Sequence, residues 1–262
     1  MKLRQSPYKN VFWTAPKPNN TYDALDVADA RAEGRNLACS SQFLAYADSS
    51  GGGNALAVLP LSSLGRNHVP VTATAYKQPL CRGHTGMINA VDFDPFDPSV
   101  VASGAEDGTA RVWAMPSAAG MDNDVQKANA TLKSPDEQAV RNVAFNPVAS
   151  GVLATGSKTG VAVWDVRGGG DAPTAVLPAL ETDNLQAMCW DRTGARIVVT
   201  AKSKVNLGGV DLHLLDPRSG AVAGTVLEAL GHNRGSDVRW AGHRAEQFIT
   251  AGYVEESLKH SV

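Results

Sequence analysis

The chain has 262 residues, a formal net charge of −2 and a sequence pI of about 6.3. This balance gives no reason to expect nucleic acid as a partner, and a charged fraction of 19% argues against a long coiled coil or a disordered chain. No stretch approaches the roughly 18 apolar residues of a membrane span, and the N-terminus, MKLRQSPYKNVFW, lacks the apolar run of a secretory signal.

The three cysteines, Cys39, Cys81 and Cys189, are widely spaced and form no CxxC pair. An odd number in this arrangement fits neither a disulfide framework nor a zinc site. We therefore expect a reduced, cytoplasmic protein that holds no metal and no cofactor.

The first predicted strands lie between Asn36 and Leu61. QFLAYAD and NALAVLPL have the composition of paired strands, and the run from Ser49 to Gly53 between them is a flexible turn. This glycine run lacks the Lys and Ser/Thr of a phosphate loop, so it does not indicate nucleotide binding.

A longer phrase then recurs along the chain. GHTGMINAVDFDP followed by VVASGAEDGTARVW is matched by AVRNVAFNP with VLATGSKTGVAVWD, by LQAMCWDRTG with VDLHLLDPR, and by GHNRGSDVRW with QFITAG. Equivalent aromatic positions recur about every 50 residues, the period of a propeller blade. Within each unit, short alternating runs end in turn signals such as Asp107-Gly108, and no helical periodicity is sustained. A β-sandwich is the alternative all-β fold, but it does not explain the recurrence of whole phrases.

One unit holds His84, Ser103, Asp107 and Trp113. These residue types could form a hydrolase triad, but no nucleophile turn surrounds Ser103. The positions resemble the structural network of WD-repeat proteins, in which His links Asp to Ser and Ser meets the Trp indole. We therefore predict a structural polar network and no catalytic residue. The next unit keeps only Thr155 and Trp164, and the last keeps His232 and Thr250.

Several phrases resemble the coronin family of WD-repeat actin-binding proteins. They are YKNVFW, NTYDAL, SSGGGNALAVLPLSSLGR, CRGHTGMINAVDFDPFDPSVVASGAEDGTARVW and LDPRSG, in this order along the chain. The resemblance implies an all-β, incomplete WD-repeat β-propeller with about four to five of seven blades. It also implies a cytoskeletal, non-enzymatic protein that binds actin filaments and regulates actin organisation, with the Arp2/3 complex as a further partner.

The expected division of the chain follows the repeats and the family. Residues 1–35 would form an N-terminal segment that pairs with the last blade, and residues 36–262 the partial propeller. The blades are expected near 36–80, 81–130, 131–175, 176–225 and 226–262.

The chain departs from the coronin pattern in two respects. Coronins carry basic residues after the Tyr-Asp phrase, where this chain has Asp26 and Asp29. Coronins also continue into further blades and a coiled-coil oligomerisation region, which this chain does not contain. We expect a truncated gene model or a fragment, with a natural short paralogue as the alternative.

The hairpins that follow the second strand of each unit are expected to share one face of the propeller, and the basic residues Lys158, Lys202 and Lys204 fall there. Together with Lys9, they are the candidate contacts to acidic actin, although lysines also serve simply to keep a surface soluble. The alternative function is a generic WD-repeat scaffold in trafficking or signalling.

Overall fold

The structure, a computed structural model, describes residues 14–22, 25–29, 35–49, 52–64, 78–117, 121, 123–158, 160–169, 172–177, 180, 182–203, 209–230, 235–241 and 247–252. Apart from a short 3-10 helix, Pro18–Asn20, the regular elements in these ranges are strands. The segment 1–13, including Lys9, lies outside the described residues, as does most of the stretch expected to pair with the last blade. No helix in the described part of the chain is both long and apolar enough to cross a membrane.

The strands form four four-stranded antiparallel sheets and one two-stranded sheet, each built from consecutive strands. We call these sheets blades 1 to 5. Blade 1 contains β1 (Leu37–Cys39), β2 (Phe43–Asp48), β3 (Ala55–Pro60) and β4 (Leu80–Arg82). Blade 2 contains β5 (Ile88–Phe93), β6 (Val100–Ala105), β7 (Thr109–Ala114) and β8 (Ala130–Lys133).

The remaining blades follow in chain order. Blade 3 contains β9 (Asn142–Phe145), β10 (Val152–Gly156), β11 (Val161–Asp165) and β12 (Ala175–Val176). Blade 4 contains β13 (Thr182–Trp190), β14 (Ile197–Ser203), β15 (Val210–Asp216) and β16 (Ala221–Leu230). Blade 5 contains β17 (Ser236–Ala241) and β18 (Gln247–Gly252).

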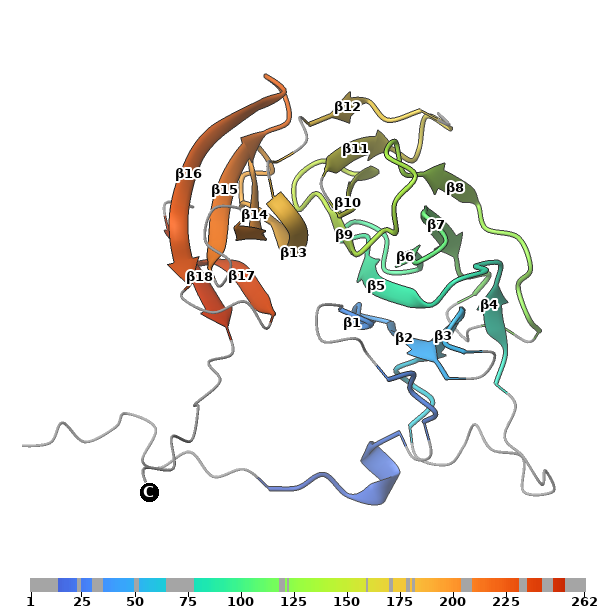
Figure 1. The fold of residues 1–262 in the computed structure, drawn as a ribbon. Helices are drawn as coiled ribbons and strands as arrows, with labels where there is room; N and C mark the ends of the chain where they lie inside the picture. Colours follow the sequence, from blue (N-terminus) through green and yellow to red (C-terminus); the bar gives the residue numbers. More distant parts are fainter. Residues whose placement is uncertain are drawn as a thin grey trace, which may run out of the picture.

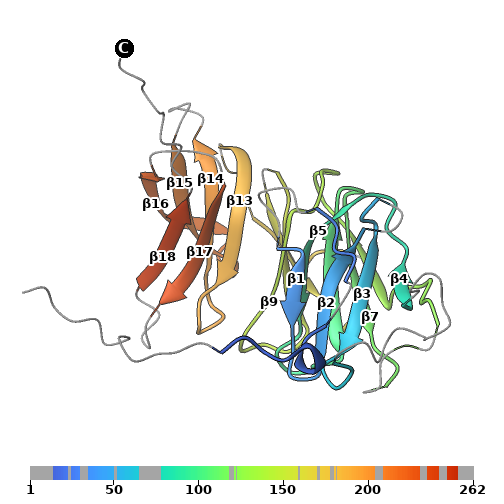
Figure 2. The same ribbon diagram turned by 90° about the horizontal axis from the view of Figure 1, so that it is seen from below.

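The blades stand side by side around an arc, from blade 1 at the lower right of Figure 1 to blade 5 at the lower left. The first strand of each four-stranded blade lies toward the centre and the last lies outside. Figure 2 shows the same sheets from below. The described sheets do not close into a ring, and the predicted all-β, incomplete propeller is confirmed.

The boundaries expected at 80/81, 130/131, 175/176 and 225/226 fall within β4, β8, β12 and β16. Each outer strand belongs to the sheet that precedes it, since it pairs with the third strand of that blade. The outer strands β8, β12 and β16 are largely exposed and carry a weak hydrophobic pattern, whereas Leu80 and Cys81 of β4 are buried. The start of each blade is therefore easier to recognise in the sequence than the end of the blade before it.

Apolar side chains fill the space between neighbouring blades. Blade 1 meets blade 2 through a cluster that includes Phe43, Val91 and Trp113. The next interface, between blades 2 and 3, includes Leu132 and Trp164. A sheet in the middle of the arc is covered on both faces, so strands such as β6 are buried along nearly their whole length instead of alternating.

Candidate functional site

The predicted quartet of blade 2 comes together in space. His84 lies between β4 and β5, Ser103 is on β6, Asp107 is in the turn after β6, and Trp113 is on β7. His84 Nε2 lies 2.8 Å from Ser103 Oγ, His84 Nδ1 lies 3.0 Å from Asp107 Oδ2, and the Trp113 indole donates to Ser103 Oγ at 2.9 Å. The four side chains thus form one continuous chain of hydrogen bonds.

The Asp107 carboxylate anchors this chain. Burial alone would raise its pKa, but hydrogen bonds from His84, from the Thr109 hydroxyl and from the Thr85 backbone N–H outweigh burial and hold the pKa well below its usual value. The Asp107 carboxylate accepts a proton from His84 Nδ1–H, and in this tautomer Nε2 accepts the Ser103 hydroxyl proton. The Ser103 oxygen then accepts the indole proton, and every member of the network is satisfied.

The burial of the network determines its role. Ser103 has no exposed surface, and the His84 side chain is 1% exposed. A substrate cannot reach the Ser103 hydroxyl in this arrangement. The hydrogen bonds instead connect the segment before β5, the strands β6 and β7, and the turn between them. The distances and the burial fit the structural network that we propose from the sequence, and its role stays a prediction.

Blade 3 carries an altered version of the same site. The Trp164 indole donates to Thr155 Oγ1 at 2.8 Å, the contact that Trp113 makes with Ser103 in blade 2. Asp136 lies in the segment before β9 that corresponds to the His84 segment before β5. Its carboxylate accepts the Ser134 hydroxyl at 2.6 Å and the Ser157 hydroxyl at 2.5 Å.

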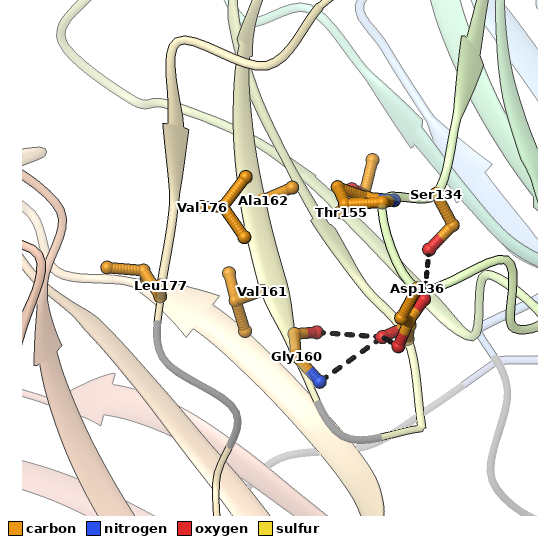
Figure 3. Close-up of a pocket in the computed structure, with 10 residues that line it drawn as sticks. Ser134, Asp136, Thr155, Gly160, Val161, Ala162, Val176 and Leu177 are labelled. Atoms are coloured by element: carbon orange, nitrogen blue, oxygen red, sulfur yellow. Dashed lines mark hydrogen bonds between the residues drawn. The ribbon is translucent and has the colours of Figure 1, made fainter.

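A pocket of about 170 Å³ opens beside this altered site. In Figure 3 the labelled residues surround it, with Asp136 and Gly160 at one side and Thr155, Ala162 and Val176 at another. The expectation that this unit keeps only Thr155 and Trp164 of the quartet left out Asp136. Aligning Phe145 with Phe93 and counting back would have placed Asp136 opposite His84.

Two of the candidate actin-binding lysines lie close together. The Lys158 carbonyl accepts the backbone N–H of Leu185 at 2.9 Å, and Lys202 pairs with Asn184, the preceding residue of β13. Lys158 is exposed and Lys202 is half-buried. The hairpins of blades 3 and 4 therefore approach each other on one face. Lys204 and Lys9 lie outside the described residues, as does His232, whereas Thr250 is half-buried on β18 and pairs with Val238.

The centre of the arc contains a second cavity, of about 510 Å³, lined mainly by first strands and the residues beside them. Arg35, just before β1, reaches across to blade 5, where it pairs with the Asp237 carboxylate and donates to the Val238 carbonyl at 3.4 Å. On β5, burial raises the pKa of Asp92 to about 6, although the Phe145 N–H and the charges of Arg35 and Arg239 oppose the shift.

Two protein families match parts of this chain. The family described as "Domain of unknown function (DUF1899)" matches residues 1–66, and the family described as "WD domain, G-beta repeat" matches residues 77–114. The coronin-like protein of Saccharomyces cerevisiae is 29% identical over 77% of this chain, and the coronin-like protein crn1 of Schizosaccharomyces pombe is 27% identical over 97% of it.

A solved structure extends the likeness to three dimensions. The crystal structure of the WD40 domain of Toxoplasma gondii coronin aligns with a TM-score of 0.71 and 27% identity, covering 84% of this chain and 52% of that one. The chain spans 31% and 40% of the lengths of the two fungal relatives. The repeated blades, the WD-type network and these likenesses lead to one conclusion: the chain belongs to the coronin family of WD-repeat proteins.

Proposed function

We propose that this chain binds actin filaments and takes part in regulating actin organisation. The observation that supports this most strongly is the likeness to coronins along nearly the whole chain, at 27% identity over 261 residues with the Schizosaccharomyces pombe protein. The Arp2/3 complex is a further partner that we propose on the same basis.

The proposed contact surface is the face that carries Lys158 and Lys202. Lys158 follows β10 and Lys202 lies near the end of β14, the equivalent second strands of adjacent blades. The backbones of the two lysines contact consecutive residues of β13. Because actin is acidic, two neighbouring cations on one face would attract it and make the association sensitive to salt. Lys204 and Lys9 remain sequence-based candidates for the same contact.

The acidic residues near the N-terminus favour the alternative, a WD-repeat scaffold in trafficking or signalling. Asp26 and Asp29 are both exposed. They stand where coronins carry basic residues, so that contact with the filament is not available to this chain. The proposal therefore depends on the lysine face and not on the N-terminal phrase.

Co-sedimentation with filamentous actin separates the two functions. We expect the chain to pellet with filaments, and the double variant Lys158→Glu/Lys202→Glu to bind more weakly and with a flatter salt dependence. The matched control is Lys127→Glu/Lys133→Glu, which makes the same charge change at exposed residues preceding and ending β8. If the unaltered chain stays in the supernatant, actin binding is wrong and the scaffold function stands. If both double variants weaken binding equally, the lysine face is wrong.

A further inference from the structure

The pocket of blade 3 occupies a place that blade 2 fills with its own side chains. The strand register establishes the equivalence. Ser103 pairs with Arg111 in blade 2, and Thr155 pairs with Ala162 in blade 3. Because Ser103 and Thr155 both accept a tryptophan indole, Arg111 and Ala162 stand at the same position of their blades.

Arg111 packs tightly in blade 2. A Cβ atom placed on Gly83 would lie 2.7 Å from Arg111 Nη1 and 3.3 Å from Arg111 Cζ. The guanidinium group therefore lies directly against the segment that carries His84. Together, the Arg111 and His84 side chains fill the space beside Ser103.

Blade 3 has lost both of these side chains. Ala162 replaces the arginine, and Asp136 replaces the histidine, so the space that they occupy in blade 2 opens as the pocket of about 170 Å³. The charge at this position also differs between the blades. Blade 3 has the Asp136 carboxylate in the pocket lining, whereas blade 2 has the Arg111 guanidinium nearby. The pocket therefore lies at the position where blade 2 holds the guanidinium group of Arg111.

The lining has the chemistry to hold a planar cation. The Asp136 carboxylate and the Ser157 hydroxyl provide oxygen atoms at one side, and Thr155 contributes another. Val161, Ala162, Val176 and Leu177 form apolar walls, against which the stem of a long side chain can pack. Ligand pockets for whole cofactors or drug-sized molecules measure roughly 300–1,000 Å³, so this pocket fits a single side chain.

We propose that this pocket binds the guanidinium group of an arginine side chain presented by a partner protein. Arginine fits better than lysine, because a planar fork of N–H donors can reach both a carboxylate and hydroxyl oxygens. Burial would raise the pKa of Asp136, but the hydrogen bonds from the Ser134 and Ser157 hydroxyls outweigh burial and lower this pKa below its usual value. The carboxylate therefore carries its charge at neutral pH. The site does not depend on actin binding and would operate in either proposed function.

The Trp164 indole gives a direct readout, because it donates to Thr155 at the pocket wall. The whole chain is labelled with indole-15N tryptophan, and Trp164→Phe identifies the Trp164 signal. Titration with N-acetylarginine amide is expected to shift the Trp164 indole resonance in a saturable way and to leave that of Trp113 unchanged. The citrulline analogue, which has the same shape without the charge, is expected to cause no saturable shift.

Two variants test the residues. Asp136→Asn is expected to weaken binding of the probe by roughly tenfold or more, the effect of removing one charge-assisted interaction. Ala162→Arg restores the blade 2 residue, fills the pocket and should abolish the shift, with Ala162→Ser as the control that leaves the pocket open. No saturable shift in the unaltered protein overturns the proposal, and an equal shift with the citrulline analogue overturns the assignment to a guanidinium. These two results come from the unaltered chain, so they decide the matter even if a variant fails to fold.

Discussion

The hydroxyl oxygen of Ser103 lies 2.8 Å from Nε2 of His84, in a site where neither side chain is reached by water. Their contact joins the segment that precedes blade 2 to the second strand of that blade. It is the middle link of the chain from Trp113 to Asp107, the set of residues that we propose to serve structure in this protein.

Removing the imidazole tests this link. His84→Ala leaves the Asp107 carboxylate and the Ser103 hydroxyl without their shared partner, so we expect a loss of about 1–3 kcal/mol in the free energy of unfolding. Urea denaturation measures the change. Thr85→Ala, at an exposed neighbour whose backbone N–H still reaches Asp107, should change stability by less than about 0.5 kcal/mol. Equal stability of the His84 variant and the unaltered chain would show that the network contributes nothing.

The close approach of blades 2 and 3 predicts a cost at Gly104. A Cβ atom there would lie 2.6 Å from Val140 Cγ1 and 3.0 Å from Val143 Cγ1. Gly104→Ala should therefore force these valines apart and destabilise the fold by about 1–3 kcal/mol. Gly224→Ala is the matched control, because nothing lies within 4 Å of the added methyl group. Thermal unfolding of the two variants should separate them, and a Gly104 variant as stable as the Gly224 variant would mean that the blades do not meet this closely.

The half-buried Asp92 on β5 predicts a pH dependence of stability. Its pKa rises to about 6 in the folded chain from the ordinary 3.8, so the folded state binds the proton more tightly than the unfolded state. The resulting stabilisation is fully present below about pH 4 and is lost as the pH rises through 6. Asp92→Asn removes this titration. The stability of the variant relative to the unaltered chain should therefore increase as the pH rises from about 4 to 6 and stay constant above that range, measured by urea unfolding.

Asp97→Asn supplies a control of opposite sign. Hydrogen bonds from Ser99 lower the pKa of Asp97, so its stabilisation is present above the ordinary carboxyl pKa and is lost as the pH falls. Over the range in which the Asp92 variant gains stability, the Asp97 variant should be less stable than the unaltered chain by a constant margin, because the lowered pKa of Asp97 places its titration below this range. Parallel pH profiles for the two variants would contradict the burial of Asp92.

The cysteines should react unequally. Cys39 is exposed, whereas burial raises the pKa of Cys81 to about 12 and that of Cys189 to about 11. Because the thiolate is the reactive form, a thiol reagent such as Ellman's reagent should modify one thiol rapidly in the folded chain and three after denaturation. Cys39→Ser should remove the rapid phase. Rapid reaction of a second thiol in the folded chain would place a buried cysteine at the surface.

The parts that could be predicted from the sequence are those with a local signal. The alternating runs of β5 and β7, the Asp107-Gly108 turn and the closing tryptophans repeat in order, so the blades follow from the pattern. The membership of His84, Ser103, Asp107 and Trp113 in one network could be inferred from resemblance, but their distances could not.

The rest depends on contacts between units. The pairing of Arg35 with Asp237 joins residues that lie about 200 positions apart in sequence. A periodic pattern in the sequence does not predict such a pair. The pocket of blade 3 lies where Asp136 and Ala162 replace the larger His84 and Arg111 of blade 2. This difference is found only when the registers of the two blades are compared. The outer strand β16, exposed over most of its length, shows why blade boundaries were harder to place than blade centres.

Indole hydrogen exchange tests the central claim, that the chain is built from repeated blades in which Trp113 and Trp164 hold the same place. Both side chains are 1% exposed, and both indoles donate to a hydroxyl, of Ser103 and Thr155 respectively. The account predicts that both indole protons exchange slowly, with similar protection, and lose it together when the chain unfolds. Strong protection of one indole with free exchange of the other would contradict it.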